Sequence, residues 1–470
     1  MAYCHTLLVT FPGQGQINPA LQLAKSLLKM GVKKVTFSTS ISATRSMVKL
    51  AGSLPEDLSI VPFSDGYDSG FAWGYDDIGD FISSLISNGS HAIKELIMAK
   101  ANECHPITHV VYTPFMSWVL KICYEYGISA TFFWIQPAAV LDIYFYYFNG
   151  YREKIENFMR GDIIELTWLP LLSDCDLPSF LLDPSPEVNR IAVRELKDHL
   201  QLLEKEENAT ILVNSFDGLE YEALRAMKKF KMMAIGPLVP SEFLDGKYPL
   251  GVSFGGDMLP TLKDYVKWMN SKHEGSLVYV AFGSYSELSM KQMEQIAHGL
   301  LESQKTFLWV IRTSYSGEKL EEKLSCKDEL EKQGMIVPWC SQMEVLSHPC
   351  VGCFVTHCGW NSSLESMVAG VPVVAVPLWN DQATNAKFIQ DVWKIGVRAI
   401  ANDGGVFEAN EIKRCIELVM DGGKIGEEMR INAKKWQGLA REAAKDGGPS
   451  NMNLRTFVNE LGDGVTKTTI

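Results

Sequence analysis

The sequence predicts an α/β protein built from two domains, each organised around a parallel sheet. Three observations support this prediction. The 470 residues exceed the size at which one hydrophobic core usually stops growing. Short apolar runs alternate with stretches of helical period along the chain, which is typical of parallel α/β sheets. A stretch rich in Gly and Pro, 239–257, separates two such series and is expected to be a linker.

The first series, 1–238, begins with a buried strand and a glycine-containing turn into an amphipathic helix at 13–30. An aromatic helix is expected at 136–151, and its rings either line an apolar cleft or pack against other helices. The proline-rich region 155–200 is expected to form long irregular loops, which in a compact enzyme are functional or mobile. The strands expected here are 5–11, 34–40, 58–63, 108–115, 128–134, 210–216 and 231–237, with a further helix at 76–101.

The second series, 258–445, shows the same alternation, and a final segment follows at 446–470. Its centre runs from Trp339 to Gln382 in the order strand, turn, helix, strand. Ligands of open α/β sheets bind beyond the carboxyl ends of the strands, so the polar residues after these strands are candidate ligand contacts. The other expected elements are helices at 260–271, 289–303 and from about 408, and strands at 276–284, 306–312 and 394–399.

Composition excludes several classes of function. A net charge of −12 argues against nucleic acid and anionic membranes as partners. No run of eighteen apolar residues is present, and the N-terminus lacks the basic region and cleavage site of a signal peptide. The ten cysteines show no disulfide framework, which is consistent with reduced thiols and a cytoplasmic location.

One group of residues has ligand types suited to zinc: His348, Cys350, Cys353, His357 and Cys358. However, Cys353 belongs to an apolar strand, and a free Cys commonly behaves as a small buried hydrophobe. Buried thiols are therefore favoured over a zinc site, and no metal is expected.

The turn HCGWNSSLES carries the densest set of polar residues. Gly359 would allow a sharp turn, and Asn361 or Ser362 is expected to cap the following helix. Such a helix start binds anions, and His357 could donate to a phosphate oxygen. A capping box would explain Ser362 and Glu365 but would leave His357 unexplained.

The residues from Trp339 to Gln382, WCSQMEVLSHPCVGCFVTHCGWNSSLESMVAGVPVVAVPLWNDQ, resemble the signature box of the plant family-1 UDP-dependent glycosyltransferases. The context of Thr113 and the run WIQPA at 134–138 resemble the branch of anthocyanin 5-O-glucosyltransferases and carboxylic-acid glucosyltransferases. The resemblance covers nearly the whole chain. It implies a GT-B fold, in which two Rossmann-like domains face each other across a cleft. It also implies that the first domain binds the acceptor, the second binds the UDP-sugar, and the segment 446–470 packs back on the first domain.

The resemblance also implies the site residues. Trp339 would stack on uracil, while Gln342 and Glu365 would bind the ribose hydroxyls. A terminal Gln resembles the glucose-using members of the family. The full implied UDP set is Ser284, Trp339, Cys340, Gln342, His357, Asn361, Ser362 and Glu365, and the implied sugar set is Trp360, Asp381 and Gln382. No cofactor or metal is implied besides the UDP-glucose substrate.

The sequence departs from the family at the catalytic base. The family's turn after the first strand resembles G-H-x-N-P with His as the base, whereas this chain has GQINP with Gln16. An amide side chain has no proton-accepting pKa in the working range and cannot serve as a general base. The family's partner Asp is also absent, because Thr113 stands in its place.

We expect a UDP-glucose-dependent inverting glycosyltransferase acting on a small plant metabolite, either a flavonoid or other phenol or a carboxylic acid. An ionised carboxylate needs no base, while an ordinary phenol or alcohol does. An alternative is a sugar-nucleotide-binding protein with little transferase activity. A nicotinamide-dependent oxidoreductase is disfavoured because no G-x-G-x-x-G fingerprint follows a strand. A monomer is expected.

Overall fold

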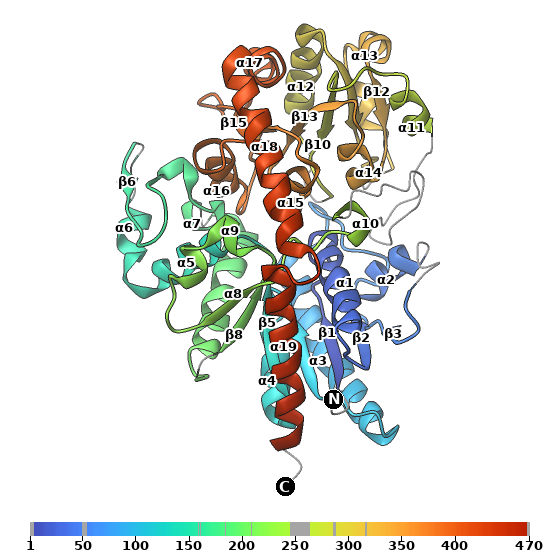
Figure 1. Cartoon of the computed structure of the whole chain (residues 1–470), viewed down its shortest axis with the longest axis vertical. Coiled ribbons are helices and arrows are strands. Elements are labelled where there is room, and N and C mark those ends of the chain that lie inside the picture. Colours follow the sequence, from blue (N-terminus) through green and yellow to red (C-terminus); the bar gives the residue numbers. More distant parts are fainter. Residues whose placement is uncertain are drawn as a thin grey trace.

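The computed structural model describes residues 4–48, 54–157, 159, 161–183, 185–207, 209–244, 264–284, 288–314 and 317–467. Within these ranges the chain forms two α/β domains, one above the other in Figure 1, each containing a parallel sheet. The first sheet has the strand order β3-β2-β1-β4-β5-β8-β9, and the second has the order β12-β11-β10-β13-β14-β15. The expected fold of two parallel-sheet domains is therefore confirmed.

The first sheet is covered on both faces, so its central strands β1 and β4 are buried along their whole length and are mostly apolar. All five residues of β1, His5–Val9, are buried between β2 and β4. The strands of this domain are β1 His5–Val9, β2 Lys34–Ser38, β3 Leu58–Ile60, β4 His109–Tyr112, β5 Ser129–Trp134, β8 Thr210–Val213 and β9 Lys231–Ala234, with a separate hairpin of β6 Ile163–Ile164 and β7 Leu172–Ser173. Its helices are α1 Gln14–Lys29, α2 Ile41–Val48, α3 Ile78–Asn102, α4 Ser117–Tyr126, α5 Ala138–Tyr146, α6 Arg152–Glu156, α7 Ser179–Leu182, α8 Glu187–Leu203, α9 Asp217–Glu220 and α10 Ser241–Leu244.

The second sheet repeats the arrangement, and β10 lies at its centre between β11 and β13. Its strands are β10 Leu277–Ala281, β11 Thr306–Val310, β12 Met335–Val337, β13 Val351–Thr356, β14 Val373–Ala375 and β15 Gly396–Arg398. Its helices are α11 Asp264–Met269, α12 Met290–Ser303, α13 Lys327–Gln333, α14 Gln342–Leu346, α15 Trp360–Ala369, α16 Gln382–Lys387, α17 Ala409–Asp421 and α18 Gly423–Ala444. In both sheets the carboxyl ends of the strands lead into the loops that carry the predicted site residues.

The prediction of irregular loops over 155–200 is wrong for its second half. Helix α8, Glu187–Leu203, has a strong one-sided apolar pattern with Ile191, Leu196 and Leu200 buried. The prolines before it mark the helix start at Pro186, a position where proline is tolerated. The loops of this region are therefore confined to the part that precedes α8.

The end of the chain connects the two domains. Helix α18 runs beside α15 of the second domain, and α19, Pro449–Lys467, continues along the first domain (Figure 1). On α19, Leu454 and Phe457 belong to the same buried cluster as Leu8 of β1. Asn453 donates from its amide to the carbonyl of Ala234 over 2.8 Å. The last helix therefore packs on the first domain.

The domain boundaries stay a prediction, because residues 245–257 of the expected linker lie outside the described residues. The start of the helix expected at 260–271 also lies outside them, and α11 is described from Asp264 onward. Within the described ranges, no helix combines the length and apolar character needed to cross a membrane.

Candidate active site

A cavity of about 470 Å³ lies where the loops of the two domains meet. The first domain contributes the start of α1, the ends of β4 and β5, and α8, and the second contributes the loops after β10, β11 and β13. Most of the predicted site residues line this cavity: Gln16, Ser284, Trp339, Cys340, Gln342, His357, Trp360, Asn361, Ser362, Glu365 and Asp381. The fold therefore gathers residues that are more than three hundred positions apart in the chain.

Helix α15 begins at Trp360, and no side chain caps its N-terminus at Gly359. The prediction that Asn361 or Ser362 caps it is wrong, because both side chains have partners elsewhere. Asn361 donates from Nδ2 to the carbonyl of Gly15 over 2.8 Å, and Ser362 accepts from Gln342 Nε2 over 2.9 Å. Since Gly359, Trp360 and Asn361 line the cavity, the positive end of the helix dipole faces it and forms a site suited to an anion.

The sharp turn before α15 is made by a residue other than the glycine we expected. Cys358 has φ 63, in the left-handed region, whereas Gly359 has φ −54. Gly359 is needed for space, since a Cβ there would lie 2.6 Å from Nε2 of His357. A Cβ on Gly283 would lie equally close to the same atom, so the two glycines enclose the imidazole from two loops.

His357 lies at the carboxyl end of β13 and faces the cavity. Burial, aided by the nearby positive charge of Arg312, lowers the pKa of His357 to about 4. The imidazole is therefore neutral at pH 7. The Thr356 hydroxyl lies 3.3 Å from its Nδ1, and when Thr356 donates there, Nε2 carries the proton and can donate to a ligand.

Sequence reasoning missed Arg312, which follows β11 and also lines the cavity. Its guanidinium donates from Nη1 to the carbonyl of Ser284 in the loop after β10. Its position just beyond the carboxyl end of a strand was a signal that could have found it. Together with the start of α15, Arg312 makes this end of the cavity electropositive.

A network of hydrogen bonds connects α14 and α15 beside this anion site. Gln342 donates from Nε2 to Glu365 Oε2 over 2.7 Å as well as to Ser362. The hydroxyl of Tyr279, on β10, donates to Gln342 Oε1 over 3.4 Å. Trp339 lies before this network and lines the same part of the cavity. An aromatic face next to a carboxylate and an amide suits a nucleoside, which offers a base and a diol.

Two of the predicted sugar contacts, Asp381 and Gln382, lie where the loop after β14 enters α16, and they have different surroundings. Asp381 is 4% exposed, lines the cavity and accepts from Asn385 Nδ2 over 2.7 Å. Burial raises the pKa of Asp381 to about 6. Gln382 is absent from the cavity wall, and its Oε1 accepts from the backbone N–H of Leu378 and of Trp379. In this arrangement Gln382 supports the loop that presents Asp381.

Trp360 lies at the junction of the two domains. Its indole N–H donates to the carbonyl of Asn214 in the first domain over 2.7 Å, and its ring lies against Trp393. Because that N–H is engaged, the indole can meet a ligand only through its ring edge or face. The backbone N–H of Trp360 belongs to the uncapped first turn of α15.

The two positions expected for the family's catalytic pair, Gln16 and Thr113, lie in different environments. Gln16 is 9% exposed and lines the cavity, and its buried Oε1 has no hydrogen-bond partner within the protein. Thr113 is fully buried, is absent from the cavity wall, and accepts from the backbone N–H of Phe11 over 3.1 Å. Gln16 is therefore available to a ligand, whereas Thr113 supports the loop after β1.

No other histidine replaces the missing base on the described part of the cavity wall, where His357 is the single imidazole. His5 bonds to the carbonyl of His105 and to Thr36, and burial lowers its pKa. His109 lies between Ser129 and Thr131, and burial lowers its pKa to about 3. Neither imidazole lines the cavity, so neither is placed to serve as the base.

The first domain's side of the cavity is largely apolar. It is formed by rings and aliphatic chains of several elements: Phe11, Trp73, Ile82, Phe115, Phe180, Ile191 and Leu196. Helix α5 both lines the cavity and packs in the core, the two alternatives considered for it from sequence. Tyr144 lines the cavity, and Val140, Leu141 and Ile143 belong to the core. This wall suits a flat apolar molecule with few polar groups.

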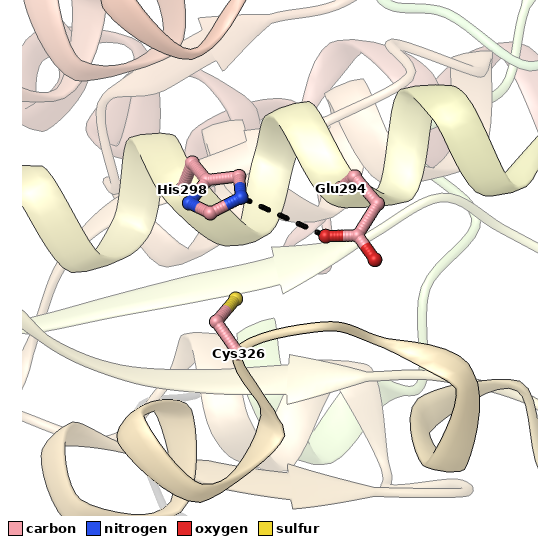
Figure 2. A group of neighbouring side chains, drawn as sticks. All are labelled: Glu294, His298 and Cys326. Atoms are coloured by element: carbon pink, nitrogen blue, oxygen red, sulfur yellow. Dashed lines mark ion pairs between the residues drawn. The ribbon is translucent and has the colours of Figure 1, made fainter.

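The suggested zinc ligands between His348 and Cys358 do not come together as a metal-binding group in the described structure. Among the described residues a different group has suitable ligand atoms: Glu294 and His298 on α12 and Cys326 before α13 (Figure 2). Both carboxylate oxygens of Glu294 already accept from Ser325, one from its N–H and one from its hydroxyl, each over 2.8 Å. Glu294 therefore holds the loop around Ser325 against α12, which explains its position without a metal ion.

Comparison with known proteins agrees with this site. The family model described as UDP-glucoronosyl and UDP-glucosyl transferase matches residues 206–428. The chain is similar to UDP-glycosyltransferase 75C1 of Solanum lycopersicum, with 53% identity over 98% of this chain and 99% of that protein. It is 50% identical to the chloroplastic crocetin glucosyltransferase of Gardenia jasminoides, over 98% of both chains. It is 47% identical to the anthocyanidin 3-O-glucoside 5-O-glucosyltransferase of Verbena hybrida, over 98% of this chain and 99% of that protein.

Among solved structures, Os79 of O. sativa in complex with UDP superposes with a TM-score of 0.84. The two chains are 30% identical, and the superposition covers 97% of this chain and 100% of the Os79 chain. Identity of about one half over whole chains, together with two facing parallel-sheet domains, leaves no support for an oxidoreductase and favours a transferase over a mere binding protein. The chain therefore belongs to the plant family-1 UDP-dependent glycosyltransferases, near the anthocyanin 5-O-glucosyltransferase branch, and is a UDP-glucosyltransferase with the GT-B fold.

Proposed function

We propose that this enzyme transfers glucose, with inversion, from UDP-glucose to a small plant metabolite that is acidic enough to ionise without a protein base. One observation supports the proposal: Gln16 lies on the cavity wall with an unpartnered amide oxygen. The resemblance described above expects the family's basic His at this position. Gly15, the neighbour of Gln16, accepts from Asn361 at the start of α15, so position 16 lies beside the anion site. Carboxylic acids and acidic phenols, including flavonoids, are the acceptor classes that fit.

In the proposed reaction, an acceptor oxygen attacks the anomeric carbon of glucose while the bond from that carbon to the β-phosphate oxygen breaks. The electron pair leaves with UDP. The uncapped start of α15, His357 and Arg312 face the position at which the negative charge of UDP grows. These groups supply positive potential from the protein itself, and for that reason we propose that no metal cofactor is needed.

A carboxylate acceptor reaches the site already ionised, so no proton has to be removed during transfer. A phenol must first lose its proton to solvent, because the amide of Gln16 cannot accept it. The carbonyl of Gln16 can still accept a hydrogen bond from a hydroxyl group and orient the acceptor. The enzyme should therefore rank acceptors by their acidity.

The donor residues have proposed roles that follow their geometry. The ring of Trp339 would stack on uracil with Cys340 beside it, and Gln342 and Glu365 would bind the ribose diol. Asn361, Ser362, Ser284 and His357 would surround the diphosphate. Asp381, supported by the loop that Gln382 holds, would accept hydrogen bonds from glucose hydroxyls, with Trp360 forming the wall beside them.

We further propose an enzyme of the cytoplasm, because none of its scattered cysteines forms a disulfide. A monomer is our proposal for its oligomeric state, to be checked by light scattering. The name of the Gardenia jasminoides relative places that protein in the chloroplast, so fractionation of the tagged protein should distinguish the two compartments.

The proposal is tested with UDP-glucose and three acceptors of similar size: a carboxylic acid, a phenol and an aliphatic alcohol. Product formation is followed by mass-resolved chromatography from about pH 5 to 9. The carboxylic acid should react at a rate that is nearly flat above its pKa, the phenol rate should rise as the phenol ionises, and the alcohol should react least. An alcohol that reacts as fast as the carboxylic acid would overturn the proposal.

A further inference from the structure

A segment of the first domain is bonded to the loop between β14 and α16 of the second domain, residues 376–381, which we name the sugar loop. We name Ser173–Leu182 the interdomain strap. It consists of a short 3₁₀ turn, Asp174–Asp176, followed by α7, and it lies between β7 and α8. Its partners in the second domain are the loop before α16, α16 itself and β15.

The first half of the strap is anchored by a buried carboxylate. Asp176 is 3% exposed, and one of its oxygens accepts from Arg398 Nη1 over 2.6 Å. The other oxygen accepts from Ser173, from its N–H over 2.8 Å and from its hydroxyl over 2.6 Å, and lies 3.7 Å from the ammonium of Lys387. The backbone carbonyl of Asp176 accepts from the hydroxyl of Thr384, on α16, over 2.6 Å. A buried charge satisfied on both oxygens gives a well-defined geometry.

The second half of the strap holds the backbone of the sugar loop directly. Asn380 has φ 57, a left-handed conformation that Asn adopts more readily than most residues with a Cβ. Its N–H donates to the hydroxyl of Ser179 over 2.6 Å, and its carbonyl accepts from the N–H of Ser179 over 2.9 Å. The rings of Phe180 and Trp379 pack beside this pair with centroids 5.8 Å apart. Asn380 is thus held by Ser179 through both its backbone N–H and its backbone carbonyl.

Asn380 immediately precedes Asp381, whose carboxylate lines the cavity. A third contact from the first domain reaches the same carboxylate, since Gln136 lies with Nε2 3.4 Å from Asp381 Oδ1. The orientation of Asp381 therefore depends on residues of the other domain. In contrast, the bonds that join Gln342 to Ser362 and to Glu365 are made within the second domain.

We propose that Ser179 and Asp176 are positioning residues that hold Asp381 in place for the glucose hydroxyls and so set the choice of sugar. The proposal rests on the proposed role of Asp381 as a sugar contact. It predicts that loosening the strap impairs sugar recognition and transfer while the nucleotide still binds. If the strap only helped the two domains to pack, loosening it would impair nucleotide binding and sugar transfer together.

The experiment compares Ser179→Ala with Ser179→Thr, which keeps the hydroxyl, and with Asp183→Asn as a control just beyond the strap. The carboxylate of Asp183 accepts from Ser185, and its backbone bonds to Ser179 and Asn189, all within the first domain, so Asp183→Asn changes a side chain that does not touch Asn380. UDP affinity is measured by calorimetry, and kcat and KM are measured with UDP-glucose and UDP-galactose. Thermal unfolding confirms that each variant is folded, and Asp176→Asn is included as a second disruption of the strap.

For Ser179→Ala we expect about a tenfold loss of kcat/KM with UDP-glucose, the size of effect from losing one well-placed hydrogen bond. The ratio of UDP-glucose to UDP-galactose efficiency should fall, UDP affinity should stay unchanged, and Ser179→Thr should restore most of the loss. If rate and sugar ratio are unchanged in both Ser179→Ala and Asp176→Asn, the proposal is overturned. It is equally overturned if UDP affinity falls in step with turnover.

Asp381→Asn separates failure of this proposal from failure of the sugar-site assignment. If Asp381→Asn has normal efficiency and sugar ratio, the assignment of Asp381 is wrong and the strap has no sugar contact to position. If Asp381→Asn is impaired while both strap variants behave like Asp183→Asn, the sugar site stands and the strap proposal is wrong.

Discussion

Replacing Gln16 by His should convert the enzyme into one that activates phenols itself. General-base catalysis contributes roughly 10²- to 10⁴-fold where a proton must leave in the transition state. Position 16 lies on the cavity wall beside the start of α15, so an imidazole there would reach the attacking oxygen. The gain should appear in kcat/KM for phenols and be far smaller for carboxylic acids, which are already ionised.

The structure places the expected gain at the lower end of that range, about 10²-fold. The base usually needs a carboxylate to orient it and to stabilise the imidazolium. At position 113 the hydroxyl already accepts from the N–H of Phe11, and it carries no charge. Position 16 is also largely buried, and burial lowers the pKa of the chain's other enclosed imidazoles, His109 to about 3 and His357 to about 4. The new imidazole should therefore titrate below its usual value of about 6.5.

The assay is the pH dependence of kcat/KM for one phenol and one carboxylic acid, from about pH 4 to 9. With Gln16 the phenol rate should climb with pH as the phenol ionises. In Gln16→His a step should appear below pH 6.5, followed by a plateau, because the base is active once it has lost its proton. Adding Thr113→Asp should move this step upward and raise the plateau, since a negative neighbour favours the imidazolium.

Gln22→His is a matched control. Gln22 lies on the same helix, lines the same cavity and has the same exposure of 9% as Gln16. An imidazole at position 22 makes the same change of side chain but does not lie beside Gly15, the residue that bonds to Asn361 at the start of α15. If Gln16→His gives no more phenol transfer than Gln22→His, and its pH profile keeps the parent shape, then position 16 is not where a base acts and the proposed geometry of attack is refuted.

Three further predictions concern the donor site. His357→Ala should weaken UDP binding by about 1.5–3 kcal/mol through loss of a donor to a charged group, whereas His298→Ala on the outside of α12 should leave it unchanged in calorimetry. UDP binding should also be accompanied by proton uptake, because a diphosphate near His357 raises the pKa of this imidazole, which is about 4 in the free protein. Uptake should be largest between that pKa and the raised pKa of the complex, and it should vanish below about pH 4. Binding heats compared across buffers measure the uptake, which should be missing in His357→Ala. UDP-glucose should exceed UDP-galactose in kcat/KM, and Gln382→Ala should reduce both rates by releasing the loop at Leu378 and Trp379; equal efficiencies of the two donors in the parent enzyme would contradict the assigned sugar site.

Residues close together in the chain could be assigned from sequence. The alternation of apolar runs and helical periods reflects burial of both sheet faces, and so it predicted the two parallel sheets. His357 directly follows β13 and Glu365 lies on α15, the next helix in the chain, so local geometry alone places them near each other. The same reasoning could have found Arg312, which occupies the equivalent place after β11.

Side-chain partners across the domain interface could not be predicted from local pattern. Asn361 and Ser362 suit a helix cap by residue type, yet Gly15 and Gln342 engage them. Gln382 suits a sugar contact, yet its oxygen holds the loop before it. A polar side chain takes the partner that burial and distance offer, and that choice depends on the whole packed structure.

The sequence by itself determined the fold class and the family, because these depend on residue identity and on periodicity along the chain; that position 16 is where a base would act stays a prediction. The tertiary structure alone decided that Gln16 faces the cavity with a free carbonyl while Thr113 is buried against Phe11. It also brought Ser179 onto Asn380, two hundred and one positions later in the chain. Contacts of such separation form only when both domains have folded and docked, since no local periodicity encodes them.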